Sequence, residues 1–152
     1  MTTSQKYDNL VRQQEGCVLH PYKDQAGVAT IGIGTTRYPG GAYVTMQDPP
    51  ITQEQADEYL ENDTKDAADA VTAYVTSAIN QNQFDALCDF AYNAGTGALH
   101  GSTLLRLVNA NPSDPNIRAA FGMWDKIHVN GQLVVLDDLV NRRKAEADLY
   151  FS

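Results

Sequence analysis

The spacing of apolar positions predicts a short helix at the start of the chain. Within residues 4–14, Tyr7, Leu10 and Val11 fall on one face of a helix. The residues between them are polar, as expected for an amphipathic helix at a protein surface. This helix therefore delivers Glu15 at its C-terminal end.

A different pattern follows directly after that helix. Residues 19–22 and 28–34 read as two strands that flank a turn at residues 24–27, which predicts an antiparallel hairpin. Pro39-Gly40-Gly41 marks a second turn, and residues 43–46 predict a return strand. We expect this small antiparallel sheet to form the wall of a cleft.

Helical spacing returns at Thr52 and continues to about Ala78. Thr52 and Gln55 have the spacing of a capping box, in which each side chain satisfies a backbone N–H of the other residue. A continuous helix over this range is about 40 Å long at a rise of about 1.5 Å per residue. It either bridges two lobes of the molecule or breaks near residues 62–64.

The second half of the chain predicts further helices and one hairpin turn. Asn80 or Asn82 is expected to cap the first helix, Ser102 the second, and Asn130-Gly131 suits a two-residue hairpin turn. The expected helices cover residues 83–93, 103–109, 115–124 and 138–150. The predicted class is α+β: a small antiparallel-sheet lobe (about 15–50) and a helical lobe (about 64–152 plus the N-terminal helix), joined by the long helix, with a cleft between the lobes. No repeat or linker interrupts residues 1–152, so we expect one domain.

Composition and charge narrow the classes of function. The hydrophobic content of 43% is ordinary for a globular protein. The formal net charge of −8 argues against nucleic-acid binding through a basic face. No run of about twenty apolar residues predicts a membrane span, and residues 1–14 lack the apolar core of a signal peptide. We therefore expect synthesis in the cytoplasm and no membrane insertion.

The cysteines and histidines predict neither a metal site nor a cofactor site. Cys17 and Cys88 lie outside any metal-ligand or CxxC spacing, and buried free thiols are the simpler interpretation. The three histidines, His20, His100 and His128, are scattered along the chain.

Three polar residues around the predicted hairpin are the candidates for chemistry. Glu15 ends a helix, Asp24 lies in the turn and Thr30 lies in the second strand, so the hairpin can bring them together. Glycoside hydrolysis uses such a pair of carboxyl groups, one as acid and one acting on water or the sugar carbon. Each residue also has an ordinary structural interpretation as a helix end, a turn former or a strand residue. Spacing alone favours the ordinary interpretation.

The run from Glu15 to Gly34 resembles the catalytic signature of phage-type lysozymes, glycoside hydrolase family 24, which includes many endolysins. In that family a Glu is followed after eight residues by Asp and after five more by Thr, and Glu15, Asp24 and Thr30 match in type and spacing. The resemblance continues in order over nearly the whole chain, through Ile51–Ala56, Asn82–Leu87, Asn93–Gly95, Ser102–Leu105, Trp124 and Leu139–Glu146.

The resemblance implies a muramidase that hydrolyses the β-1,4 bond between N-acetylmuramic acid and N-acetylglucosamine in bacterial peptidoglycan. Glu15 would be the general acid, while Asp24 and Thr30 would handle the water. A Cys17–Cys88 disulfide is compatible with the resemblance but not required by it. A wall-binding module without activity, a lytic transglycosylase and a preference for chitin oligomers are the alternatives, and the intact set of three residues favours hydrolysis.

Three further residues are candidates for substrate binding. Tyr22 can stack on a sugar ring or simply pack. Gln83 and Asn93 lie on the helix expected to face the cleft, where neutral amides suit a sugar, although a solvated face or a helix end explains them equally. The partner implied is peptidoglycan, and we expect a monomer.

Two features of the helical lobe have simple structural interpretations. The resemblance implies that Trp124 lies in its core. Arg142 and Arg143 are interpreted as an exposed pair, with Glu146 one helical turn beyond Arg142, although they could instead bind acidic groups of the substrate.

Overall fold

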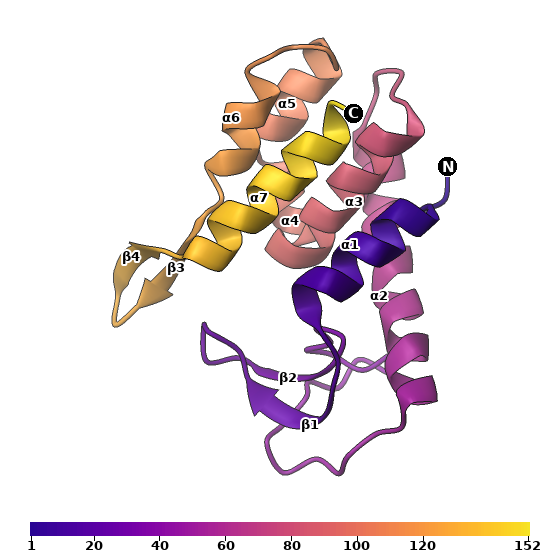
Figure 1. Cartoon of the computed structure of the whole chain (residues 1–152), viewed down its shortest axis with the longest axis vertical. Coiled ribbons are helices and arrows are strands. Elements are labelled where there is room, and N and C mark those ends of the chain that lie inside the picture. Colours follow the sequence, from indigo (N-terminus) through magenta and orange to yellow (C-terminus); the bar gives the residue numbers. More distant parts are fainter. The chain divides into compact units, whose positions relative to one another are not determined.

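The computed structural model describes residues 1–152 and divides them into two compact units (Figure 1). The sheet unit is Asn9–Lys65, and the helical unit is Met1–Asp8 together with Asp66–Ser152. Helices α1 (Gln5–Glu15) and α2 (Gln53–Tyr74) contribute residues to both units. The predicted α+β class is confirmed, because helices are combined with small antiparallel strands.

In the sheet unit, strands β1 (Val18–Lys23) and β2 (Ala29–Gly32) pair antiparallel, as predicted. Tyr22 faces Thr30 across the pair, and the register is irregular between Val18 and Tyr22. The side chains of a directly opposed pair lie on the same face of the sheet. Tyr22 and Thr30 are therefore neighbours on one face.

The predicted return strand over residues 43–46 is wrong. Between β2 and α2 the chain makes only isolated bridges, of which Arg37↔Tyr43 is one. The predicted turn before it is present, since Gly41 N–H donates to the Tyr38 carbonyl at 2.8 Å. Asp48 Oδ2 then accepts from the Thr45 N–H at 2.9 Å. This local hydrogen bond occupies the Thr45 N–H group, which in a β-strand would donate to the adjacent strand.

Helix α2 is continuous, so the predicted alternative of a break near residues 62–64 is wrong. Its capping box is confirmed, because Gln55 N–H donates to Thr52 Oγ1 at 3.1 Å and Thr52 N–H to Gln55 Oε1 at 2.9 Å. The helix ends at Tyr74, earlier than predicted. Asn109 Nδ2 donates to the Tyr74 carbonyl at 3.0 Å, and Asn109 Oδ1 accepts from the Thr76 N–H at 2.8 Å. A side chain distant in the sequence thus caps α2.

The helical unit is built around α3, of which every residue from Phe84 to Ala91 is buried. Its N-cap is Asn80, whose side chain forms a capping box with Gln83. Helix α7 packs against α3 and α6, as Figure 1 shows. The sequence did not predict α4. The helices of this unit are α3 (Gln81–Ala94), α4 (Thr96–His100), α5 (Thr103–Ala110), α6 (Ile117–Gly122) and α7 (Asp137–Tyr150).

A second hairpin joins α6 to α7 and consists of β3 (Lys126–Val129) and β4 (Gln132–Val135). Asn130 and Gly131 have φ angles of 51° and 79°. Positive φ at both central residues is typical of the turn that the sequence predicts here. All four residues of β4 are exposed.

Trp124, predicted in the core, is 37% exposed. Its ring packs in a T-shaped arrangement with that of Phe90 at a centroid distance of 5.8 Å, and it lies where the chain leaves α6 for the exposed hairpin. No helix in the structure combines the length and the apolar character that a membrane span needs.

Candidate functional site

Glu15 is the last residue of α1, and its side chain is half-buried in the sheet unit. The backbone just beyond β2 passes directly beside its carboxyl group at Gly34. A Cβ atom built on Gly34 would lie 2.7 Å from both Cδ and Oε2 of Glu15. Gly34 also has φ +74°, a conformation that other residues rarely adopt. The absence of a side chain at residue 34 thus makes room for the carboxyl group.

Asp24 opens the turn between β1 and β2. Its Oδ1 accepts from the N–H groups of Ala26 at 2.9 Å and Val28 at 2.8 Å. The Asp24 N–H donates to the Val28 carbonyl at 3.0 Å. These bonds fix the direction of the carboxylate and leave Oδ2 outside the turn. The turn-forming role and a chemical role are therefore compatible in one residue.

Thr30 is 3% exposed and lies in β2. Its Oγ1 donates to the Val28 carbonyl at 2.9 Å. Since a hydroxyl has one proton and two lone pairs, this bond leaves Thr30 able to accept hydrogen bonds. The backbone of Val28 contacts both candidates, so it fixes Thr30 relative to Asp24.

Tyr22 is half-buried and lies opposite Thr30 across the β1–β2 pair. Burial and then the nearby charges of Glu15 and Asp24 raise the pKa of the phenol. Its side chain shares one face of the hairpin with Thr30. The structure thus brings together four of the candidate residues, Glu15, Tyr22, Asp24 and Thr30, within the sheet unit.

Gln83 and Asn93 belong to the helical unit, and protein contacts use their amide groups. Gln83 Oε1 accepts from the Asn80 N–H at 2.9 Å as part of the α3 cap, and its Nε2 donates to the Pro112 carbonyl at 3.3 Å. Asn93 Oδ1 accepts from Arg143 Nη2 at 2.5 Å. A substrate contact by either amide stays a prediction.

The interpretation of Arg142 and Arg143 as an exposed pair is wrong, because both are buried. Arg142 donates to both oxygens of Asp89, from Nε at 2.9 Å and from Nη2 at 2.8 Å. Arg143 Nη2 lies 2.9 Å from Glu146 Oε1, and its guanidinium carbon lies 5.0 Å from the centre of the Phe90 ring. We call Asp89, Arg142, Arg143 and Glu146 the buried ionic cluster.

Sequence reasoning missed Asp89, the member of this cluster on α3. The sequence did contain an indication that Asp89 is buried and paired, because Asp89 precedes Asn93 by one helical turn and α3 is apolar around it. An acidic residue on a buried helical face requires a partner.

The two carboxyl groups of the cluster differ in their protonation. Burial alone would raise the pKa of Asp89, but the charge and hydrogen bonds of Arg142 outweigh it and lower that pKa. Burial raises the pKa of Glu146 well above its usual value, and the charge of Asp89 adds to this effect against the opposing Arg143. Neither oxygen of the buried Glu146 carboxyl group has a hydrogen-bond partner. The raised pKa of Glu146 favours its protonated form, whereas the lowered pKa of Asp89 favours the ionised form.

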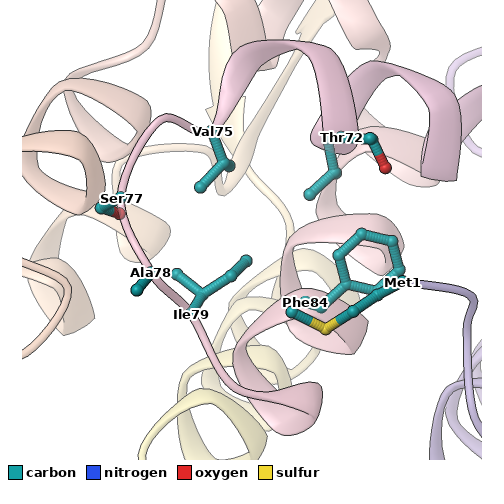
Figure 2. Close-up of a pocket in the computed structure, with 8 residues that line it drawn as sticks. Met1, Thr72, Val75, Ser77, Ala78, Ile79 and Phe84 are labelled. Carbon is teal, nitrogen blue, oxygen red and sulfur yellow. The ribbon is translucent and has the colours of Figure 1, made fainter.

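Other features of the molecule lack the groups needed for hydrolysis or metal binding. A cavity of about 240 Å³ lies where α2 ends and α3 begins, lined by apolar groups such as Val75, Ile79 and Phe84 together with Met1 (Figure 2). No titratable side chain lines it. No group of three or more His, Cys, Asp or Glu side chains is arranged around a possible metal position.

The two cysteines are both free thiols. Cys88 is buried, as predicted, and burial raises the pKa of its thiol. Cys17 is exposed, which corrects the prediction that both are buried. Its Sγ lies 3.5 Å from Gln53 Oε1. No disulfide links the two residues.

Comparison with known proteins gives consistent matches over the length of the chain. A family model described as Phage lysozyme matches residues 12–146. An endolysin of Acyrthosiphon pisum secondary endosymbiont phage 1 is 34% identical over 100% of this chain and 99% of its own length.

Two solved structures are also similar. An endolysin from Escherichia coli O157:H7 phage FAHEc1 has a TM-score of 0.90 and 38% identity, and the match covers 100% of this chain and 94% of that one. The muramidase domain of SpmX from Asticaccaulis excentricus has a TM-score of 0.82 and 30% identity, with 99% and 98% covered. The predicted lysozyme-like fold is thereby confirmed.

Proposed function

The chain belongs to the phage lysozyme family, and from this premise we propose that it is a muramidase acting on bacterial peptidoglycan. The bond proposed is the β-1,4 linkage between N-acetylmuramic acid and N-acetylglucosamine. The observation that carries the proposal is the local geometry of the sheet unit. There, a half-buried Glu15 fits against Gly34, and the backbone of Val28 holds both Asp24 and Thr30.

Glu15 is proposed as the general acid. In its protonated form it gives a proton to the oxygen that leaves when the glycosidic bond breaks. Gly34 keeps space open beside the carboxyl group, and the end of α1 fixes its position. A positioned acid of this kind is worth about 10²- to 10⁴-fold in rate.

Asp24 and Thr30 are proposed to hold and activate the attacking water. Because the Thr30 hydroxyl donates its hydrogen bond to the Val28 carbonyl, its lone pairs can accept a hydrogen bond from the water. Asp24 uses Oδ1 for the turn, so Oδ2 is free to accept the second proton of the water as the oxygen attacks the sugar carbon. Glu15 loses a proton and Asp24 gains one, and exchange with solvent restores both.

A water held in this way favours an inverting reaction. Inverting enzymes separate their two carboxyl groups by about 6.5–9.5 Å to leave room for the water, whereas retaining enzymes place them about 5–5.5 Å apart. A threonine hydroxyl beside Asp24 gives that water a defined partner. We further propose that residues 1–152 act as one domain and as a monomer.

The main alternative is a lytic transglycosylase, in which a hydroxyl of the substrate attacks in place of water. The Asp24–Val28–Thr30 arrangement favours hydrolysis, because transglycosylation has no need of residues that hold a water. The test is mass spectrometry of the products released from purified peptidoglycan. Reducing muramic ends support the proposal, while anhydro-muramic ends contradict it. Chitin oligomers serve as a second substrate, and faster cleavage of chitin would contradict the muramidase assignment.

A further inference from the structure

The hydroxyl of Tyr22 has no hydrogen-bond partner within the protein, although its side chain is half-buried and lies opposite Thr30. Tyr38, which is also half-buried, donates to Asp48 Oδ2 at 2.7 Å, and the fully buried Tyr150 donates to the Pro112 carbonyl at 2.8 Å. A partly buried phenol normally finds such a partner. The hydroxyl of Tyr22 is therefore available to a molecule bound at this face.

The groups around Tyr22 offer acceptors rather than donors. Asp24 in its ionised form can only accept hydrogen bonds. Thr30 has committed its single proton to the Val28 carbonyl. The proton of Glu15 is, under the proposed function, given to the leaving oxygen. Among these four side chains, Tyr22 alone has a donor that neither the protein nor the reaction uses.

Its surroundings also keep this donor in place. Burial and the charges of Glu15 and Asp24 raise the pKa of the phenol above its ordinary value of 10.0. Tyr22 thus keeps its proton at every pH at which a wall-degrading enzyme would work. Its position opposite Thr30 in the register of β1 and β2 fixes the side of the sheet from which it donates.

We propose that the Tyr22 hydroxyl donates a hydrogen bond to the acetamido carbonyl oxygen of the sugar whose glycosidic bond is cleaved. This inference rests on the proposed function. In an N-acetylated glycan, the acetamido group is attached to the carbon next to the reacting one, and its carbonyl is a neutral acceptor without a proton of its own. A donor near Asp24 and Thr30 is therefore near this group. Tyr22 would be a specificity residue that distinguishes N-acetylated glycan from its de-N-acetylated form.

The experiment compares the unmodified protein with Tyr22→Phe on three preparations of one wall: native, de-N-acetylated, and de-N-acetylated then chemically re-acetylated. Phenylalanine keeps the ring and removes only an oxygen that has no protein partner, so the fold is expected to persist. On the native and re-acetylated walls, kcat/KM of Tyr22→Phe is expected to fall by about 3- to 10-fold, the size of one neutral hydrogen bond. On the de-N-acetylated wall the two proteins are expected to cleave at equal rates.

Tyr43→Phe provides the matched control. Tyr43 is 71% exposed, lies in the same unit and contacts Arg37 through its ring, so its variant is expected to match the unmodified protein on all three walls.

Two results would overturn the inference. Tyr22→Phe with unchanged kcat/KM on native wall would leave Tyr22 with a role in stacking or packing only. An equal loss on all three walls would mean that Tyr22 acts on the catalytic groups and not on the acetamido group. Both results leave cleavage by the unmodified protein intact. Failure of the proposed function is distinct, because the unmodified protein would then release no sugar fragments from native wall.

Discussion

The α-carbon of Gly34 approaches the carboxyl group of Glu15 so closely that no side chain fits between them. A Cβ on Gly34 would lie 2.7 Å from Glu15 Oε2, well inside van der Waals contact. The Glu15 carboxyl group at the end of α1 thus packs against the Gly34 backbone beyond β2, and this contact sets the position of the proposed acid. Gly34 is as much a part of the candidate site as Glu15, although it has no chemistry of its own.

Glu15→Gln tests the proposed acid. The amide keeps the size of the side chain but cannot supply the proton, so clearing of purified wall is expected to fall by at least about 100-fold. Circular dichroism is expected to stay unchanged. Glu58→Gln, at an exposed glutamate of the same unit, is the control and should clear wall normally. Normal clearing by a folded Glu15→Gln protein would remove Glu15 from this role.

Gly34→Ala tests the close approach. The new methyl group collides with the Glu15 carboxyl group and also imposes strain at φ +74°, which costs about 1–3 kcal/mol. We expect both a lower stability and a wall-clearing rate at least about 10-fold lower.

Gly41→Ala separates the two effects of that substitution. Gly41 also has a positive φ, +97°, but a Cβ there meets nothing closer than 3.7 Å. This variant should lose stability and keep its clearing rate. Equal clearing by both folded variants would show that contact with Glu15 does not matter for the reaction.

The anomeric form of the first product tests the role of Thr30. If Asp24 and Thr30 hold the water, hydrolysis of the β-linkage inverts the anomeric centre, and proton NMR of a defined wall oligomer shows the α-anomer first. Thr30→Glu places a carboxylate into the space of that water, close enough to attack the sugar carbon. We expect this variant to accumulate a covalent glycosyl adduct or to switch to retention. A β-anomer formed first by the unmodified protein would instead make Asp24 a nucleophile.

Glu146→Gln tests the raised pKa of Glu146 in the buried ionic cluster. The pKa of Glu146 is raised in the folded protein, so from about pH 4.5 upward the unfolded chain releases a proton that the folded protein keeps. Stability therefore falls as pH rises toward the folded-state pKa, by about 1.4 kcal/mol for each unit by which that pKa is raised. Glutamine imitates the protonated acid and removes this loss. In urea unfolding, Glu146→Gln is expected to gain stability relative to the unmodified protein between pH 5 and pH 8.

Asp89→Asn is the contrasting variant, since it removes the buried carboxylate that lies 2.8 Å from Arg142 Nη2. A loss of about 3–5 kcal/mol is expected. The pKa of Asp89 is lowered in the folded protein, so the contribution of Asp89 to stability is present above its ordinary pKa and is lost as the pH falls below it.

The prediction for Glu146→Gln has its own contradicting outcome. A Glu146→Gln protein that is destabilised equally at pH 5 and pH 8 would show that Glu146 is ionised in the cluster.

The sequence by itself determined the features in which both partners lie within a few residues. The capping box of Thr52 with Gln55 and the turn at Asn130-Gly131 were predicted correctly, and Asn80 was one of the two N-caps predicted for α3. The antiparallel hairpin around the Asp24–Gly27 turn was also predicted, although its register was not. In each case the bonds join positions close along the chain, so the local pattern contains all the information.

Tertiary structure decided the features whose partners are remote in sequence. Helix α2 ends at Tyr74 because Asn109, 35 positions later, takes its carbonyl. Arg142 is buried because Asp89, 53 positions earlier, compensates its charge. The periodicity of a helix shows which of its residues share a face. It does not show which other element packs against that face. Burial of a charge depends on that partner, because an uncompensated charge stays in water.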